Sequence, residues 1–417
     1  MPYRELSEAL LDCPDKSIPL RLPSGGANVL AEDLHFPLLV LKESALAHNI
    51  AAMAKWCSQS GLLLAPHGKT TMCPRIWHRQ LDAGAWGITV ATVSQALACV
   101  AAGVPRILIA NQVVGRSAAA SLAQAMHERT GVEVYCLVDS VDSVRQLASQ
   151  LTAAGAVRTV SVLVEWGRPG WRTGVRSVEE ALPVLEELKV HGHVLRYAGV
   201  EGFEGLAHSE SGPAEEVHQV DDFLRDAARF AFQFGVPSKN ELPIFSIGGT
   251  AFLDRVREIA RAAAGRYRVV ARSGCYVTHD HGYYSSRLQA AEERSPGAVP
   301  EFKPALELWS LVQSRPDPGI AILTFGKRDC AYDIDLPLPL FTVPASGPRS
   351  TQIRLHPARI SHLNDQHAYL CQAPDGLRVG DLVCCGISHP CTAFDKWRVI
   401  PTVDDSYSVL EWYRTYF

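Results

Sequence analysis

The sequence has no apolar run that approaches the roughly 18 consecutive residues of a membrane-spanning helix. It also has no cluster of basic residues, and its 40 Lys+Arg are outnumbered by 44 Asp+Glu, which gives a formal net charge of −4. Binding to nucleic acid usually leaves a basic run or patch in the sequence. We therefore expect neither a membrane nor a nucleic acid as a partner.

Internal repeats and low-complexity tracts are absent as well, which excludes fibrous and disordered classes. Of the 417 residues, 47% are hydrophobic and only 20% are charged, so the chain can bury a large core. A domain usually takes about 100–200 residues, and a barrel up to about 250. We expect one large and one smaller domain.

The chain has little that points to secretion or to a disulfide framework. Its N-terminus, MPYRELSEALLDCPDK, lacks the basic and apolar regions of a signal peptide. The cysteines number 11, an odd count, and the adjacent Cys384 and Cys385 could hardly form two framework disulfides. Buried, reduced thiols in a cytoplasmic protein are the expectation.

From residue 36 onward, short apolar runs alternate with segments of helical spacing. The predicted strands are 37–42, 62–69, 87–93, 106–113, 132–139, 159–166, 195–203 and 244–250. The predicted helices are 43–59, 74–83, 94–102, 118–129, 141–154, 178–190, 214–234 and 251–264. Eight strand-helix units predict an α/β fold, a (β/α)8 TIM-type barrel of parallel strands over residues 36–275, with an open doubly wound sheet as the alternative.

After Arg272 this rhythm stops, and short alternating segments separated by Pro, Gly and Asp predict a C-terminal mainly β domain over residues 276–417. Residues 278–300 carry charge and few apolar anchors, and we expect a long surface loop or insertion there. The N-terminal segment, 1–35, is predicted to pack with the β domain.

Lys69 ends the second predicted strand, in the segment Pro66-His67-Gly68-Lys69-Thr70. Active sites of such barrels lie at the carboxyl ends of the strands. Apolar walls there can lower the pKa of a lysine and make its neutral amine available for imine formation with an aldehyde cofactor. A solvated lysine at a strand end is the alternative. His67 is predicted to act as a partner of Lys69 and not as the base.

Two glycine turns could hold a phosphate. Gly248, Gly249 and Thr250 lead from the eighth predicted strand into a helix, where glycine lets the backbone approach an anion and free N–H groups are available. The segment Gly274-Cys275-Tyr276 offers a second turn beside it. A lysine at one end and a phosphate cradle at the other suggest pyridoxal phosphate. Ordinary strand-helix turns, however, also use glycine.

Two further strands place candidate residues near the barrel mouth. Arg172 follows the sixth predicted strand and could reach the nitrogen of a cofactor ring, or could simply pair with a surface carboxylate. Tyr197 and Glu201 lie four residues apart on the seventh predicted strand, so in a regular strand both face the same side. Tyr197 is therefore a candidate cofactor contact.

His389 and Cys391 lie two residues apart near the end of the β domain. In an extended segment they share a face, and imidazole with thiolate is a ligand set for Zn²⁺. Two protein ligands are too few for a structural zinc site, so a bound metal here would keep open positions for a catalytic role. A buried His and Cys without metal is the alternative.

Together, these motifs resemble the D-serine dehydratase and D-threonine aldolase-like family of fold-type III pyridoxal phosphate enzymes, which is related to alanine racemase. The resemblance implies that Lys69 binds the cofactor covalently, that the two glycine turns hold its phosphate, and that His389 and Cys391 bind a divalent metal. It also implies a homodimer. The family's D-x-G-x-x-R-x-G segment is matched loosely, with Glu165 in place of the acid and two extra residues before Arg172.

The resemblance implies a lyase that acts on a small D-amino acid. In the family, an H-x-C pair accompanies zinc and dehydration, and a soft thiolate favours zinc. We therefore expect conversion of D-serine, or a related β-hydroxy D-amino acid, to a 2-oxo acid and ammonia. A retro-aldol cleavage of D-threonine or 3-hydroxy-D-aspartate is the main alternative. A racemase and a non-catalytic cofactor-binding protein are further alternatives.

Overall fold

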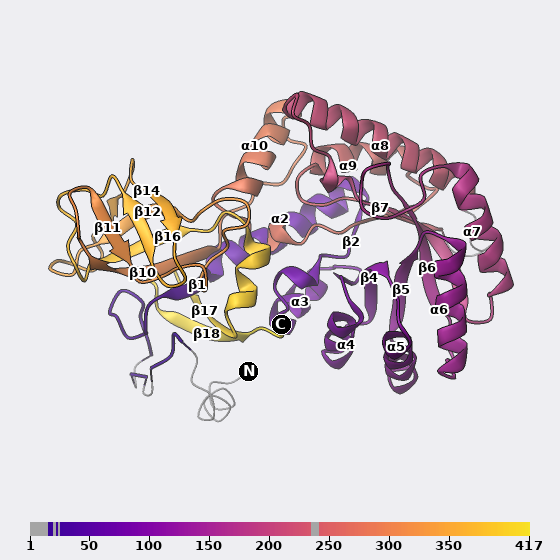
Figure 1. Ribbon diagram of the computed structural model, residues 1–417, viewed down its shortest axis with the longest axis horizontal. Helices are drawn as coiled ribbons and strands as arrows, with labels where there is room; N and C mark the ends of the chain where they lie inside the picture. Colours follow the sequence, from indigo (N-terminus) through magenta and orange to yellow (C-terminus); the bar gives the residue numbers. More distant parts are fainter. Residues whose placement is uncertain (1–15, 20–21, 24–25, 235–241) are drawn as a thin grey trace.

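The computed structural model describes residues 16–19, 22–23, 26–234 and 242–417. These residues form two sheets, which lie in opposite halves of Figure 1. The first 15 residues of the predicted N-terminal segment, and so nearly all of the stretch MPYRELSEALLDCPDK, lie outside this description. No helix within the described ranges is long and apolar enough to cross a bilayer.

The first sheet contains eight parallel strands in the order β2-β9-β8-β7-β6-β5-β4-β3. Their bounds are β2 Leu63–Leu64, β3 Ile88–Val90, β4 Arg106–Gln112, β5 Glu133–Val138, β6 Val160–Trp166, β7 Leu195–Gly202, β8 Ile244–Ser246 and β9 Arg268–Ala271. Trp86 N–H donates to the Leu64 carbonyl over 2.7 Å, and Thr89 N–H to the Pro66 carbonyl over 2.9 Å. These bonds bring the two end strands together, so the sheet curls into the predicted barrel.

Helices cover the outside of this sheet (Figure 1). Their bounds are α2 Glu43–Ser60, α3 Pro74–Asp82, α4 Val93–Ala101, α5 Arg116–Glu128, α6 Val141–Ala153, α7 Val178–Val190, α8 Pro213–Phe234 and α9 Leu253–Ala262. The strands carry apolar side chains on both faces because one face packs on the helices and the other fills the barrel. On β6, for example, Val162 and Val164 pack outward and Leu163 packs inward.

One predicted barrel strand belongs to the other sheet. Residues 37–42 form β1 (Leu38–Lys42), which pairs with β10 and β17 of the β domain. A buried apolar strand followed by a helix has the same local pattern in either setting, so periodicity could not place it. The eighth barrel strand is instead β9, a four-residue strand that directly precedes Arg272.

The second sheet has ten strands and is mainly antiparallel. Besides β1, its strands are β10 Leu306–Ser314, β11 Ile320–Leu323, β12 Leu338–Val343, β13 Ile353–Arg354, β14 Arg359–Leu363, β15 Ala368–Cys371, β16 Leu382–Gly386, β17 Val399–Val403 and β18 Val409–Arg414. Near the N-terminus, Asn28 forms an isolated bridge with Ser408, so this part of the N-terminal segment contacts the β domain.

The prediction of a surface loop over residues 278–300 is wrong, because the segment contains the helix α10 (Tyr283–Arg294). The Asp280 carboxylate accepts hydrogen bonds from N–H groups in its first turn. Arg294 pairs with Asp254 of α9. The buried residues of α10 are only Leu288 and Ala291, and this thin apolar stripe explains why hydrophobic spacing did not indicate a helix.

Candidate active site

Lys69 lies in a short 3-10 turn, η1 (Gly68–Thr70), just beyond β2. Gly68 packs so closely that an added Cβ would lie 2.7 Å from Ile88 and 2.8 Å from Trp77, which explains the glycine before the lysine. The Lys69 side chain is exposed toward a cavity of about 430 Å³ at the carboxyl ends of the strands. The cavity is also lined by residues of the barrel turns and of the β domain.

His67 lies in the wall of the same cavity. Burial, together with the positive charges of Lys69 and Arg272, holds the pKa of His67 well below its usual value, so the ring is neutral. Its Nδ1 atom has no hydrogen-bond partner among the residues that the structure describes. A neutral imidazole beside Lys69 agrees with a partner role and adds no competing positive charge.

The first glycine turn already holds an internal anion. Gly248 has φ +97°, and the N–H groups of Gly248 and Gly249 donate to the two carboxylate oxygens of Glu204 over 3.1 and 2.7 Å. Glu204, in the turn η2 (Glu204–Leu206), is fully buried. The expectation that these two N–H groups face a cofactor phosphate therefore needs correction, because a buried carboxylate already accepts their hydrogen bonds.

The neighbouring positions retain free donors. Thr250 and Ser273 join the two turns through their hydroxyl oxygens, which lie 2.6 Å apart. Within the described ranges, no acceptor is found for the backbone N–H groups of Thr250, Gly274 and Cys275. A Cβ on Gly274 would lie 2.7 Å from the His67 carbonyl oxygen, so only glycine lets this turn approach the lysine turn. These donors at the cavity wall fit the phosphate of pyridoxal phosphate.

Two predicted contacts lie away from the cavity. The side chain of Tyr276 is buried in the core and its hydroxyl accepts from Gln80 over 2.9 Å. On β7, a register shift leaves Ala198 without a partner on β6, so Tyr197 packs outward toward the helices while Glu201 faces the barrel. The prediction that Tyr197 and Glu201 face the same side is wrong, because the bulge interrupts the alternation.

A buried ion pair that the sequence pattern did not indicate holds Arg272 in the cavity wall. Arg272, only 6% exposed, pairs with Glu201 and donates to the Gly202 carbonyl over 2.7 Å. Burial raises the pKa of Glu201 to about 7, against the opposing charge of Arg272. The buried Nε atom of Arg272 has no partner among the described residues, and Arg272 lines the cavity. The guanidinium carbon of Arg172 lies 5.7 Å from the centre of the Phe203 ring, a ring that lines the cavity.

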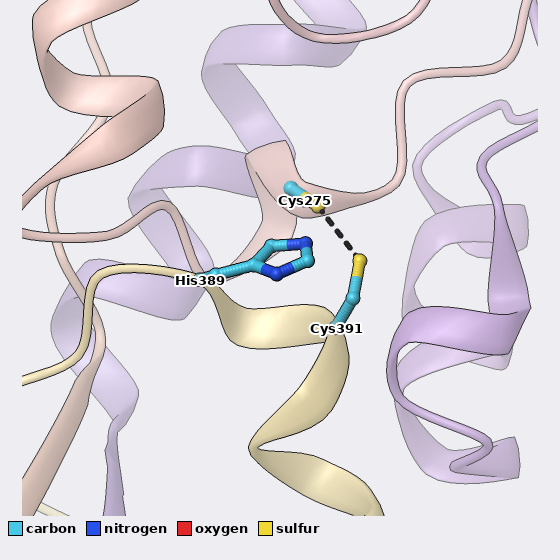
Figure 2. Close-up of side chains that lie close together, drawn as sticks. All are labelled: Cys275, His389 and Cys391. Carbon is cyan, nitrogen blue, oxygen red and sulfur yellow. Dashed lines mark hydrogen bonds between the residues drawn. The ribbon is translucent and has the colours of Figure 1, made fainter. Parts of the chain in front are cut away.

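The predicted metal pair lies in the same cavity and gains a third donor. His389 and Cys391 come from the connection after β16, around the turn η4 (Pro390–Thr392), and Cys275 comes from the barrel. Figure 2 shows the three side chains converging, with Cys275 Sγ 3.2 Å from Cys391 Sγ. One ligand atom from each of the three lies within 4.8 Å of the others. The Cys391 Sγ atom is also 3.3 Å from the Thr70 hydroxyl, beside Lys69.

Hydrogen bonds orient this donor group. The Cys275 and His389 side chains hold the pKa of the Cys391 thiol well below its usual value, so a thiolate is available. Although burial opposes it, the Cys391 thiolate and the Asp333 carboxylate raise the pKa of His389 to about 9. Asp333 accepts from His389 Nδ1 over 2.7 Å, which leaves Nε2 for a metal, and from the Thr392 hydroxyl over 2.7 Å. A histidine, two thiols and an outer carboxylate fit a zinc ion.

Comparison with known proteins agrees with this geometry. The family model "Alanine racemase, N-terminal domain" matches residues 41–268, more than half of the chain. The chain belongs to this family. A second model, "Putative serine dehydratase domain", matches residues 305–403, the part that contains the metal pair.

Individual relatives cover most of the chain. A D-threonine aldolase from Arthrobacter sp is 30% identical over 72% of this chain and 74% of the relative. A D-threo-3-hydroxyaspartate dehydratase from Delftia sp. (strain HT23) is 28% identical over 62% of this chain and 65% of the relative. The solved structure of a D-threonine aldolase from Filomicrobium marinum has a TM-score of 0.76 and 25% identity, and covers 95% of this chain and 98% of its own.

These relatives and the geometry of the site agree on the class of reaction. The chain is a pyridoxal phosphate-dependent lyase of small D-amino acids, with an alanine racemase-like barrel and a C-terminal β domain. Pyridoxal phosphate and a metal are the cofactors that the family assigns to it, and the group Cys275, His389 and Cys391 is its candidate metal site. The relatives include both a dehydratase and an aldolase, so they leave the bond that is broken undecided.

Proposed function

We propose that the protein removes the elements of water from a β-hydroxy D-amino acid, such as D-serine, and releases a 2-oxo acid and ammonia. The observation that supports this reaction is the thiol-containing donor pair, His389 and Cys391, in the wall of the cavity that holds Lys69. Thiolate ligands select zinc over hard ions such as Mn²⁺. His389 and Cys391 would hold a zinc ion here, and the ion would supply Lewis acidity that makes the β-hydroxyl a better leaving group.

The cofactor is held by groups at both ends of the cavity. Lys69 binds it covalently at one end, and the free N–H groups of Thr250, Gly274 and Cys275 receive its phosphate at the other. Arg272, fixed by Glu201, lies in the cavity wall, where its guanidinium would contact the cofactor. When bound, pyridoxal phosphate delocalises the electron pair that is left at the α-carbon.

The chain's own residues then move the proton. The substrate amine takes the place of Lys69 on the cofactor. The freed Lys69 Nζ atom then removes the proton from the α-carbon of the substrate. The lowered pKa of the buried His67 makes its imidazole a weak base, which leaves this role to the lysine. His389 and Cys391 would orient the β-hydroxyl only through the metal that they would hold. The product of elimination is an enamine, which hydrolyses in water to the 2-oxo acid and ammonia.

Retro-aldol cleavage is the second candidate, because the Arthrobacter relative at 30% identity is a D-threonine aldolase. It would use the same lysine and metal, but it would remove the hydroxyl proton and break the Cα–Cβ bond.

D-Threonine separates the two reactions in one assay. Elimination keeps all four carbons together as 2-oxobutanoate and releases ammonia, whereas retro-aldol cleavage gives glycine and acetaldehyde. With D-serine and with D-threonine, we expect one molecule of ammonia for each molecule of 2-oxo acid. Chelation of the metal should abolish both products, and added Zn²⁺ should restore them. L-Serine is the control. Glycine with aldehyde as the main products would refute the proposal in favour of the aldolase.

A further inference from the structure

We propose that Cys275 belongs to both halves of the site: its thiolate is the third protein ligand of the metal, and its backbone N–H binds the cofactor phosphate. Metal and pyridoxal phosphate then bind with positive cooperativity. The inference rests on the cofactor and metal sites of the proposed function, but it does not depend on which bond the enzyme breaks.

The side-chain positions support the ligand role. Cys275 Sγ lies 3.2 Å from Cys391 Sγ, and His389 provides the third donor of a group that spans no more than 4.8 Å. Two thiolates on one tetrahedral zinc ion lie about 3.8 Å apart, as expected from a Zn–S length of ~2.3 Å. The two sulfur atoms therefore need to separate by only about half an ångström. Figure 2 shows both sulfur atoms beside the His389 ring.

A three-residue ligand set has a chemical consequence. Catalytic zinc sites commonly have three protein ligands and one open position, and two cysteines with one histidine form one such set. The open position can take one oxygen atom, such as that of a β-hydroxyl. With only His389 and Cys391 as ligands, two positions would stay open. With Cys275 as a ligand, the metal therefore keeps one open coordination position for the substrate and not two.

The backbone of the same residue supports the link to the phosphate. Cys275 begins the turn η3 (Cys275–Val277), directly after Gly274, and neither N–H group has an acceptor within the described ranges. Only one rotatable side-chain bond separates a cysteine sulfur from its Cα. A metal that fixes the sulfur therefore restricts the Cα and the N–H direction. Since Cys275 is only 4% exposed, its turn has little room for another arrangement.

The ligand role can be tested on the unmodified protein. Zinc is loaded into the full chain under reducing conditions, without pyridoxal phosphate, and its ligands are counted by X-ray absorption spectroscopy. We expect two sulfur and one histidine nitrogen ligands in the wild type, one sulfur in Cys275→Ala, and two in the control Cys371→Ser, which changes a half-buried cysteine of β15. One sulfur in the wild type would refute the ligand role without depending on any variant.

The coupling is tested by equilibrium titration. We expect pyridoxal phosphate to bind the wild type and Cys371→Ser about 5- to 150-fold more tightly with zinc than after chelation, and zinc to gain the same factor from the cofactor. In Cys275→Ala both factors should fall close to one. Equal cofactor affinity with and without zinc in the wild type would refute the coupling, even if 2-oxo acid is produced. Strong coupling together with glycine and aldehyde products would instead refute only the proposed elimination.

Discussion

The two halves of the site are built in different ways. The cofactor half consists of turns that follow strands of one sheet: the lysine turn after β2, the Thr250 turn after β8 and the Gly274 turn after β9. The metal half combines His389 and Cys391 of the β domain with Cys275 of the barrel. The barrel alone can shape the cofactor half, whereas the metal half exists only while the two domains are docked. Treatments that loosen the docking should therefore release metal before cofactor.

The largest expected effect separates chemistry from metal binding. Lys69→Ala should lower turnover by about 1,000-fold or more, because it removes both the covalent attachment and the base. At saturating zinc, the zinc content should stay that of the wild type, since no metal donor changes. Steady-state assays and metal analysis measure the two. The control Lys55→Ala changes an exposed lysine of α2 and should keep full activity.

Covalent labelling sharpens the same prediction. Borohydride reduction of the cofactor-loaded protein, followed by peptide mass mapping, should place the cofactor mass on Lys69. A label on any other lysine would contradict the assignment.

The cofactor half was also the more predictable from sequence. Lys69 and Thr250 could be placed because parallel strands of one sheet end at the same edge, so a local motif fixes its own position. Local pattern could not pair Glu204 with the Gly248 turn, because the two lie 44 residues apart and meet only in the folded chain. The prediction for Tyr197 is wrong for another reason. A one-residue bulge in β7 reverses the alternation of side chains between the two faces of the strand, and the sequence carries no signal for it.

In the metal half, only the adjacent pair could be recognised. His389 and Cys391 share one extended segment, and their spacing is the signal. Cys275 looked like part of a phosphate turn, and Asp333 carried no signal, because each approaches His389 through packing between separate segments.

A smaller effect is expected from the carboxylate behind the metal ligand. Asp333→Ala should weaken zinc binding by about 10- to 100-fold, because it releases the ring of His389 from its fixed orientation. The visible absorption of the bound cofactor should change little. Competition with a chromophoric chelator measures the zinc affinity. Asp375→Ala, an exposed aspartate in the same domain, is the control. Unchanged zinc affinity in Asp333→Ala would show that Asp333 does not position the ligand.

The last prediction concerns folding stability and the segment that joins the two halves. His279 lies four residues after Cys275, has φ +48° and is 5% exposed, and burial lowers its pKa to about 4. The unfolded chain takes up this proton near pH 6.5, before the folded protein does, so folding stability is complete above that pH and falls as the pH drops toward 4. The loss amounts to about 3 kcal/mol at most, at ~1.4 kcal/mol for each pH unit between the two values. His281, whose pKa burial also lowers to about 4, adds to the same limb.

His279→Asn isolates this contribution, because asparagine tolerates a positive φ and does not titrate. Urea unfolding at pH 7, 6, 5 and 4 should show a flatter acid limb in His279→Asn than in the wild type, with the difference in slope approaching one proton near pH 5. The exposed His193→Asn should keep the wild-type slope. Protonation of this segment should also loosen the contact between the domains. As the pH falls, zinc should therefore leave the cofactor-free wild type at a higher pH than the cofactor-loaded wild type, because the cofactor holds the Cys275 turn. If the free energy of unfolding falls with pH equally steeply in the wild type and in His279→Asn, the acid sensitivity comes from other residues and this prediction is wrong.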